Sequence, residues 1–95
     1  MTVPKFLQSS LASYDVSKLD MEKDKDLIIT EVLNKGDENT LKWITNNYSE
    51  KDIKQVISSP IRGFWLKKTL EYWLKIFDVK LDERTLKNSV INLNA

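Results

Sequence analysis

The chain contains neither histidine nor cysteine among its 95 residues, and this absence decides most of the chemistry that its side chains can perform. Without histidine there is no imidazole to act as a general base, proton shuttle or metal ligand. Without cysteine there is no thiolate nucleophile, thiolate metal site or disulfide. The serine pairs at 9–10 and 58–59 have no evident base, and no glycine-rich phosphate loop is present. We therefore expect no catalytic residue and no cofactor.

One acidic run has the spacing of a calcium loop. Positions 1, 3, 5, 7 and 12 of that template are filled by Asp20, Glu22, Asp24, Asp26 and Glu31. Position 6, where the loop needs glycine for its bend, is Lys25, and the apolar residues from Ile28 to Leu33 recur with a helical period. Acidic residues are also favourable in the first turn of a helix because of the helix dipole. We therefore expect the start of a helix here and no metal site.

Basic residues are concentrated in the second half of the chain. Between residues 51 and 80 there are seven basic residues and three acidic ones, and the candidates for contacts with a nucleic-acid backbone are Lys51, Lys54, Arg62, Lys67 and Lys68. A short helix, a Ser-Ser-Pro turn and a longer helix in this region have the order of a helix-turn-helix. Glu71, in the middle of the exposed stripe of the longer helix, would repel phosphate. A DNA-binding regulator therefore stays as the alternative function.

The number of aromatic residues in the chain favours a function in binding a protein partner. The chain has three Trp, three Tyr and three Phe, and a small core can bury only part of so much apolar surface. Any of Trp43, Trp65 and Trp73 that is exposed beside Arg62 would resemble an interface hot spot. The competing interpretation is that each tryptophan belongs to the core. We expect a partner-binding module without enzymatic activity.

The element expected to position these residues is a long helix over 60–77. Apolar residues surround it on nearly every side, which is typical of a helix buried by its neighbours. Pro60 suits the first helical position, and Ser58 or Ser59 is a candidate cap. Glu71 lies four residues from both Lys67 and Lys75 and is expected to pair with either. This helix is predicted to be the centre of the fold.

Shorter helices are expected to pack around this centre, in a single all-α domain over residues 1–95. The first is expected from Pro4 to about Ala12, within a lead-in over 1–19, and a second follows the acidic run and ends at Gly36. Two more are predicted over 37–48, with Asp37 or Asn39 as cap, and over 49–57, where Ser49 and Asp52 form a capping box. In the tail over 82–95, Asp82 is expected to cap a last short helix that carries Leu86, Val90 and Leu93. The fold class is thus a small bundle of five or six short helices.

Bulk composition excludes several classes of protein. At 41% hydrophobic and 31% charged residues the chain has an ordinary globular composition, and no apolar run approaches the roughly 20 residues that span a bilayer. The N-terminal residues lack the long apolar segment of a secretory signal, so we expect a cytoplasmic protein with no membrane contact. The net charge of +1 is far from the strongly basic balance of most nucleic-acid binders.

A series of mainly apolar residues between about 13 and 79 occurs in a recognisable order. It comprises Tyr14-Asp15-Val16, Leu19-Asp20, Lys23-Asp24, Leu27-Ile28-Ile29, Val32-Leu33, Gly36, Leu41-Lys42-Trp43-Ile44, Ile53-Lys54, Val56-Ile57, Thr69-Leu70 and Tyr72-Trp73. This order resembles a family of small uncharacterised bacterial domains whose genes are commonly found beside nucleotidyltransferase-like toxins of the abortive-infection type. The chain departs from the family pattern at Tyr14, where tryptophan is expected, and at Tyr72, where phenylalanine is expected. The resemblance implies a non-catalytic antitoxin-like or accessory protein with such a toxin as partner, together with DNA binding for autoregulation, and it transfers no active site.

Overall fold

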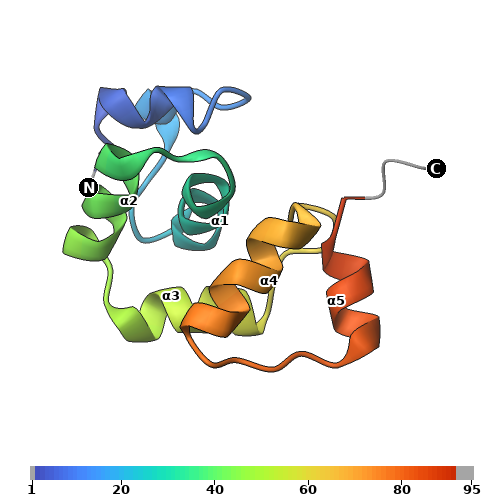
Figure 1. Cartoon of the computed structure of the whole chain (residues 1–95). Coiled ribbons are helices and arrows are strands. Elements are labelled where there is room, and N and C mark those ends of the chain that lie inside the picture. The colour runs from blue at the N-terminus through green and yellow to red at the C-terminus, as the bar shows by residue number, and fades with distance from the viewer. Residues whose placement is uncertain (1, 92–95) are drawn as a thin grey trace.

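The computed structural model describes residues 2–91, and this part of the chain is built from helices (Figure 1). Across that range there are two short 3₁₀ helices, five α-helices and two isolated β-bridges. The helices are η1 (Lys5–Ser9), η2 (Val16–Lys18), α1 (Lys25–Lys35), α2 (Glu38–Asn47), α3 (Glu50–Ser58), α4 (Lys67–Ile76) and α5 (Glu83–Ser89). The prediction of an all-α fold is confirmed.

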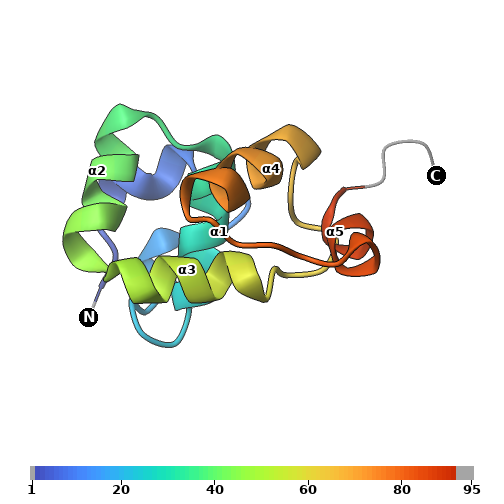
Figure 2. The ribbon, with the colours of Figure 1, turned by 60° about the horizontal axis from the view of Figure 1, so that its bottom comes forward.

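The centre of the fold is α1. Six consecutive residues of this helix, from Ile28 to Leu33, are buried, so α1 is covered on every side. It packs against α2, α3 and α4, and Figure 2 shows it in the middle of these three helices. The prediction of a central helix over 60–77 is therefore wrong. Of the residues of α4, only Leu70 and Leu74 are buried, because this helix turns a single face to α1 and α3.

Three of the predicted caps are present in the structure. The Asp37 carboxylate accepts a hydrogen bond from the Thr40 amide at 2.9 Å, and the Thr40 hydroxyl accepts one from the Asp37 amide, which begins α2 with a capping box. Ser49 and Asp52 form the corresponding box at the start of α3. The Asp82 carboxylate accepts from the Thr85 amide at the start of α5. Each cap satisfies backbone donors that a helix start leaves unpaired.

The segment before α4 is a turn and a short extended stretch instead of the predicted helix. Gly63 has φ of +75°, a left-handed conformation that ends any helical path. The Trp65 amide donates to the Ser89 carbonyl at 3.0 Å, and the Ile91 amide donates to the Trp65 carbonyl at 2.8 Å. These two bonds form a parallel bridge to a segment more than twenty residues later in the chain. The helix starts only at Lys67 because the Trp65 backbone groups are already bonded elsewhere.

Asn34, near the end of α1, hydrogen-bonds to the backbone on both sides of Trp65. Its side-chain amide donates to the Phe64 carbonyl at 3.1 Å, and its side-chain oxygen accepts from the Leu66 amide at 3.2 Å. The predicted cap at Ser58 or Ser59 is absent, since Ser58 is the last residue of α3 and its hydroxyl donates to the Lys54 carbonyl. The turn before α4 is thus fixed by tertiary contacts.

The start of α1 differs slightly from the prediction, and its end has a different cause from the one expected. Residues 21–24 form turns, and the helix begins at Lys25. Gly36 ends it as predicted, but with φ of −75°, so left-handed freedom is not the reason for glycine here. A Cβ atom on Gly36 would lie 2.5 Å from both the Val32 carbonyl oxygen and the Thr40 hydroxyl oxygen. Glycine is required because the start of α2 folds back closely on α1.

The last helix, α5, lies beside the body of the fold (Figure 1). Sixteen buried apolar side chains make up the described core, and none of them belongs to α5. Its Leu86 is half-buried, and its C-terminal end is attached through the bridge between Trp65 and Val90. Leu93, which was expected on this helix, lies outside the described residues.

The N-terminal segment lies beside α2 and α1, on the side of the fold away from α5 (Figure 1). The expected helix from Pro4 to Ala12 is the shorter 3₁₀ helix η1, which buries Leu7. The side chain of Gln8 organises the turn after it, donating to the Leu11 and Tyr14 carbonyls at 2.9 and 2.6 Å. A side chain that bonds the backbone in this way favours a turn over a continued helix.

Candidate protein-binding surface

The exposed apolar side chains of α4 form the most distinctive surface of the described residues. Tyr72 and Ile76 are each 56% exposed, which is high for large apolar side chains, and Trp73 and Phe77 beside them are half-buried. We call these four residues the α4 edge. Tyr72 and Ile76 lie four positions apart and are neighbours on the helix surface. The edge remains uncovered because α4 packs on the core through a different face, which carries the buried residues Leu70 and Leu74.

Aromatic contacts hold the α4 edge in place. The rings of Tyr72 and Trp73 meet edge to face with their centroids 5.1 Å apart, and Trp73 is 6.1 Å from the ring of Phe77. The Trp73 indole N–H donates to the Leu33 carbonyl at 3.2 Å, in the last turn of α1 where carbonyl groups lack helical partners. The indole is therefore fixed before any partner arrives.

Phe77 extends the edge toward the junction of α2 and α3. It lines a small hollow of about 150 Å³ together with Tyr48, Ile53, Thr45 and Glu50. Tyr48 donates its hydroxyl to the Met21 carbonyl at 2.9 Å. Burial, with a smaller contribution from the carboxylates of Glu22, Asp20, Asp52 and Asp24, raises the pKa of Tyr48 to about 12. Tyr48 is thus a neutral hydrogen-bond donor over the physiological pH range.

The three tryptophans occupy different environments. Trp65 is completely buried, so it belongs to the core and does not meet the condition of exposure beside Arg62 that its role as a candidate partner contact required. Arg62 is exposed on the turn before it. Trp43 is half-buried on α2, where its ring meets the Tyr48 ring at 5.9 Å. Trp73 alone of the three belongs to the α4 edge. The sequence analysis missed Tyr72, Ile76 and Phe77, although a helix apolar on nearly all sides was the signal that some of its residues stay uncovered.

The predicted nucleic-acid contacts are exposed but spread over three segments. Lys51 and Lys54 lie on α3, Arg62 on the turn, and Lys67 and Lys68 in the first turn of α4. Eight residues separate α3 from α4, whereas a helix-turn-helix uses three or four. The expected pairing of Glu71 with Lys67 or Lys75 is also absent from the ion pairs of residues 2–91. These two helices therefore lack the connection that a helix-turn-helix requires.

Two carboxylates of the acidic run over 20–26, those of Asp20 and Asp24, accept hydrogen bonds from the backbone of the run. Asp20 accepts hydrogen bonds from the Lys23 and Glu22 amides, each at 2.9 Å, and these bonds contribute to lowering the pKa of Asp20 to about 2. Asp24 accepts from the Asp20 amide at 2.8 Å. Glu31, the twelfth position of the calcium template, is buried and pairs with Lys35 at 2.9 Å. No group of acidic residues within 2–91 comes together in a way that could hold a metal ion.

Part of the chain is similar to a known protein family. A family model described as a family of unknown function (DUF6922) matches residues 13–57, slightly less than half of the chain. The matched range includes η2, α1, α2 and all of α3 except its last residue, and it ends before the α4 edge. Neither the curated proteins nor the solved structures searched contain a match. Among residues 2–91 no helix is both long and apolar enough to cross a bilayer.

Proposed function

We propose that this chain is a non-enzymatic protein-binding module that docks its partner on the α4 edge. The observation that carries the proposal is the exposure of Tyr72 and Ile76 beside the fixed rings of Trp73 and Phe77. Aromatic side chains dominate binding energy at protein interfaces, and a partner that covers this edge removes apolar surface from water. The bond from Trp73 to Leu33 reduces the entropy lost on binding, because the indole is already ordered.

The partner we propose is a nucleotidyltransferase-like toxin, with this chain as its antitoxin-like or accessory protein. The support for this identity is the resemblance in residue order between about 13 and 79, which includes Tyr72 and Trp73 of the α4 edge. A module of this kind acts by occupying a surface of its partner, so it needs a complementary apolar patch and no catalytic group.

To test the proposal, the unaltered chain and two variants are tagged and added to the lysate of the native host, and the protein recovered with each is compared. Tyr72→Ala combined with Ile76→Ser removes the exposed part of the α4 edge. Phe6→Ala is the matched control, since Phe6 is a comparably exposed apolar residue, 50% accessible, on η1. We expect a stoichiometric protein to accompany the unaltered chain and the control and to be lost with the double variant. Unchanged circular dichroism would show that all three chains are folded.

The alternative proposal, a DNA-binding regulator, is tested in the same experiment by treating half of each lysate with nuclease. It rests on the exposed lysines of α3 and of the first turn of α4. Recovery of nucleic acid that is sensitive to nuclease and to salt, with no stoichiometric protein, would favour this alternative.

Retention of the protein partner by the double variant would contradict docking on the α4 edge.

A further inference from the structure

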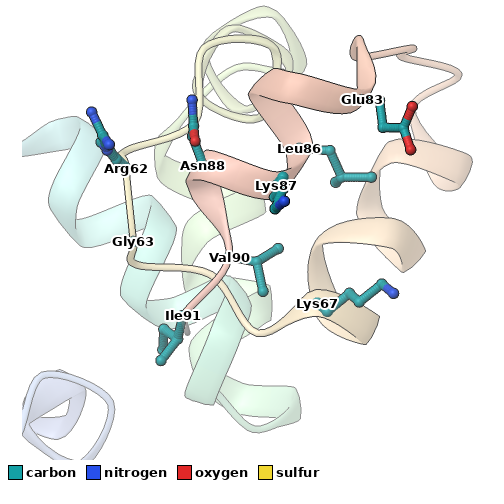
Figure 3. A pocket seen from close by; sticks show the side chains of 9 residues that line it. All are labelled: Arg62, Gly63, Lys67, Glu83, Leu86, Lys87, Asn88, Val90 and Ile91. Atoms are coloured by element: carbon teal, nitrogen blue, oxygen red, sulfur yellow. The ribbon is translucent and has the colours of Figure 1, made fainter. Parts of the chain in front are cut away.

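A second recess lies between α5 and the turn that precedes α4 (Figure 3). Its volume is about 700 Å³, and we call it the α5 hollow. Half-buried apolar side chains contribute part of its lining, namely Leu86 of α5 and Val90 and Ile91 after it. Exposed cationic residues line it as well, namely Lys67, Lys87 and Arg62. The hollow shares no residue with the α4 edge.

Backbone pairing makes the α5 hollow a preformed feature. The Gly63 amide donates to the Asn88 carbonyl at 3.0 Å, and the two bonds between Trp65 and the segment 89–91 continue the pairing. Trp65 is fully buried, so it anchors one wall of the hollow to the core. The left-handed Gly63 has open space where a side chain would be. Because folding fixes the backbone of both walls, binding a ligand does not require that backbone to be ordered.

The charge around the α5 hollow is positive. Glu83 is the one acidic residue among those that line it, against Lys67, Lys87 and Arg62. In Figure 3 Lys67 and Lys87 flank Val90, while Arg62 lies at the far side and points away from Val90. The two lysines are therefore the cations placed to meet a ligand that covers the apolar floor.

The shape of the hollow distinguishes between ligand classes. Its volume falls in the range of about 300–1,000 Å³ that small-molecule sites occupy, but such sites bury most of their ligand. The α5 hollow is open to solvent, and its cationic side chains are exposed. An open recess with an apolar floor and a cationic rim suits a chain laid across it, with an apolar side chain in the recess and carboxylates at the rim.

We propose that the α5 hollow is a second docking site, which binds an acidic segment of a protein partner through Lys67 and Lys87, with an apolar side chain of that segment on Leu86 and Val90. The proposal rests on the proposed function only in taking the partner to be a protein. A partner held at both the α4 edge and the α5 hollow would gain affinity through the second, intramolecular contact.

The first test uses a short fluorescein-labelled peptide of Asp and Glu with two central leucines, added to the full chain. Fluorescence anisotropy reports binding, and amide shifts in the ¹⁵N-labelled chain report its place. We expect shifts at Gly63, Lys87, Val90 and Ile91, and binding that weakens as added salt shortens the Debye length below about 10 Å. A dissociation constant above about 1 mM, or shifts centred on Tyr72, would overturn the proposal.

Charge variants separate a specific site from general attraction. Lys67→Glu with Lys87→Glu should weaken peptide binding about tenfold or more, since each exposed contact contributes a few-fold and reversal adds repulsion. Lys51→Glu with Lys54→Glu makes the same charge change on α3, outside the hollow, and should leave the affinity within about twofold. Glu83→Gln should tighten binding by about twofold. An equal loss with both lysine pairs would show that the attraction is nonspecific and would overturn the proposal.

A single-stranded oligonucleotide of the same charge is the competing ligand. If it displaces the peptide and shifts the same amides with higher affinity, the hollow binds nucleic acid and the proposal is wrong. Because the peptide contains no part of the toxin, its failure to bind would leave docking on the α4 edge standing. Loss of the partner with the Tyr72 and Ile76 variant is likewise independent of the peptide result.

Discussion

Replacement of Trp65 by phenylalanine should destabilise the fold far less than its replacement by alanine. Trp65 is completely buried, and its indole N–H has no hydrogen-bond partner among the described residues. Truncation of a buried tryptophan to alanine costs about 3–5 kcal/mol through lost burial and the cavity left behind. That is a large part of the roughly 5–14 kcal/mol expected for the unfolding of 95 residues.

Phenylalanine keeps most of the ring volume and removes the unpaired N–H group. A buried donor without an acceptor costs about 1–3 kcal/mol, so its removal offsets much of the packing loss. We expect the free energy of unfolding to fall by about 0–1.5 kcal/mol for Trp65→Phe. With a urea m-value of roughly 1.5 kcal/mol/M, the midpoint should move by less than about 1 M, against about 2–3 M for Trp65→Ala.

Urea unfolding followed by far-ultraviolet circular dichroism measures both variants. Trp73→Phe is the matched control, because its indole N–H does donate, to the Leu33 carbonyl. Loss of that bond should cost about 0.5–1.5 kcal/mol on top of the packing change. A loss of about 3 kcal/mol or more for Trp65→Phe would refute the reasoning, since the N–H group would then be making a favourable interaction.

Further predictions concern backbone geometry and titration. Gly63→Ala should lower the free energy of unfolding in urea by about 1–2 kcal/mol, because the φ of Gly63 is +75°. Gly36→Ala should lower it by about 1–3 kcal/mol, because the added Cβ would meet a carbonyl oxygen. An unchanged free energy of unfolding for either variant would contradict the stated cause. The pKa of Tyr48 is raised from 10.0 to about 12, so its contribution to stability is full below pH 10 and lost as pH rises to about 12. Absorbance titration should show a tyrosine near pH 12 that Tyr48→Phe removes, and a Tyr48 midpoint near 10 would contradict the proposed burial. The pKa of Asp20 is lowered from 3.8 to about 2, so its contribution to stability is full above pH 3.8 and lost as pH falls to about 2. Carboxyl chemical shifts in an NMR titration measure this pKa, and a value near 3.8 would contradict stabilisation of the carboxylate by its hydrogen bonds.

The sequence by itself predicted the fold class and most helix starts. Asp37, Ser49 and Asp82 each cap a helix through an amide three residues later, so the whole interaction lies within one short stretch of sequence. Gly36 was also correctly predicted to end α1, although its φ of −75° shows that left-handed freedom is not the cause. Such capping signals depend only on neighbouring residues, so they set the start of a helix without any contact from distant parts of the chain.

Only the tertiary structure decided where α4 begins and which aromatic residues it leaves exposed. Residues 60–66 have a helical pattern of apolar side chains, but Trp65 bonds to Ser89 and Ile91, and Asn34 bonds on either side of it. The partners lie more than twenty residues away in both directions, so no local pattern reveals them. The bonds from Trp65 to residues 89 and 91 also form the walls of the α5 hollow. The burial of Trp65 and the exposure of Tyr72 and Ile76 likewise depend on which distant segments pack beside each residue.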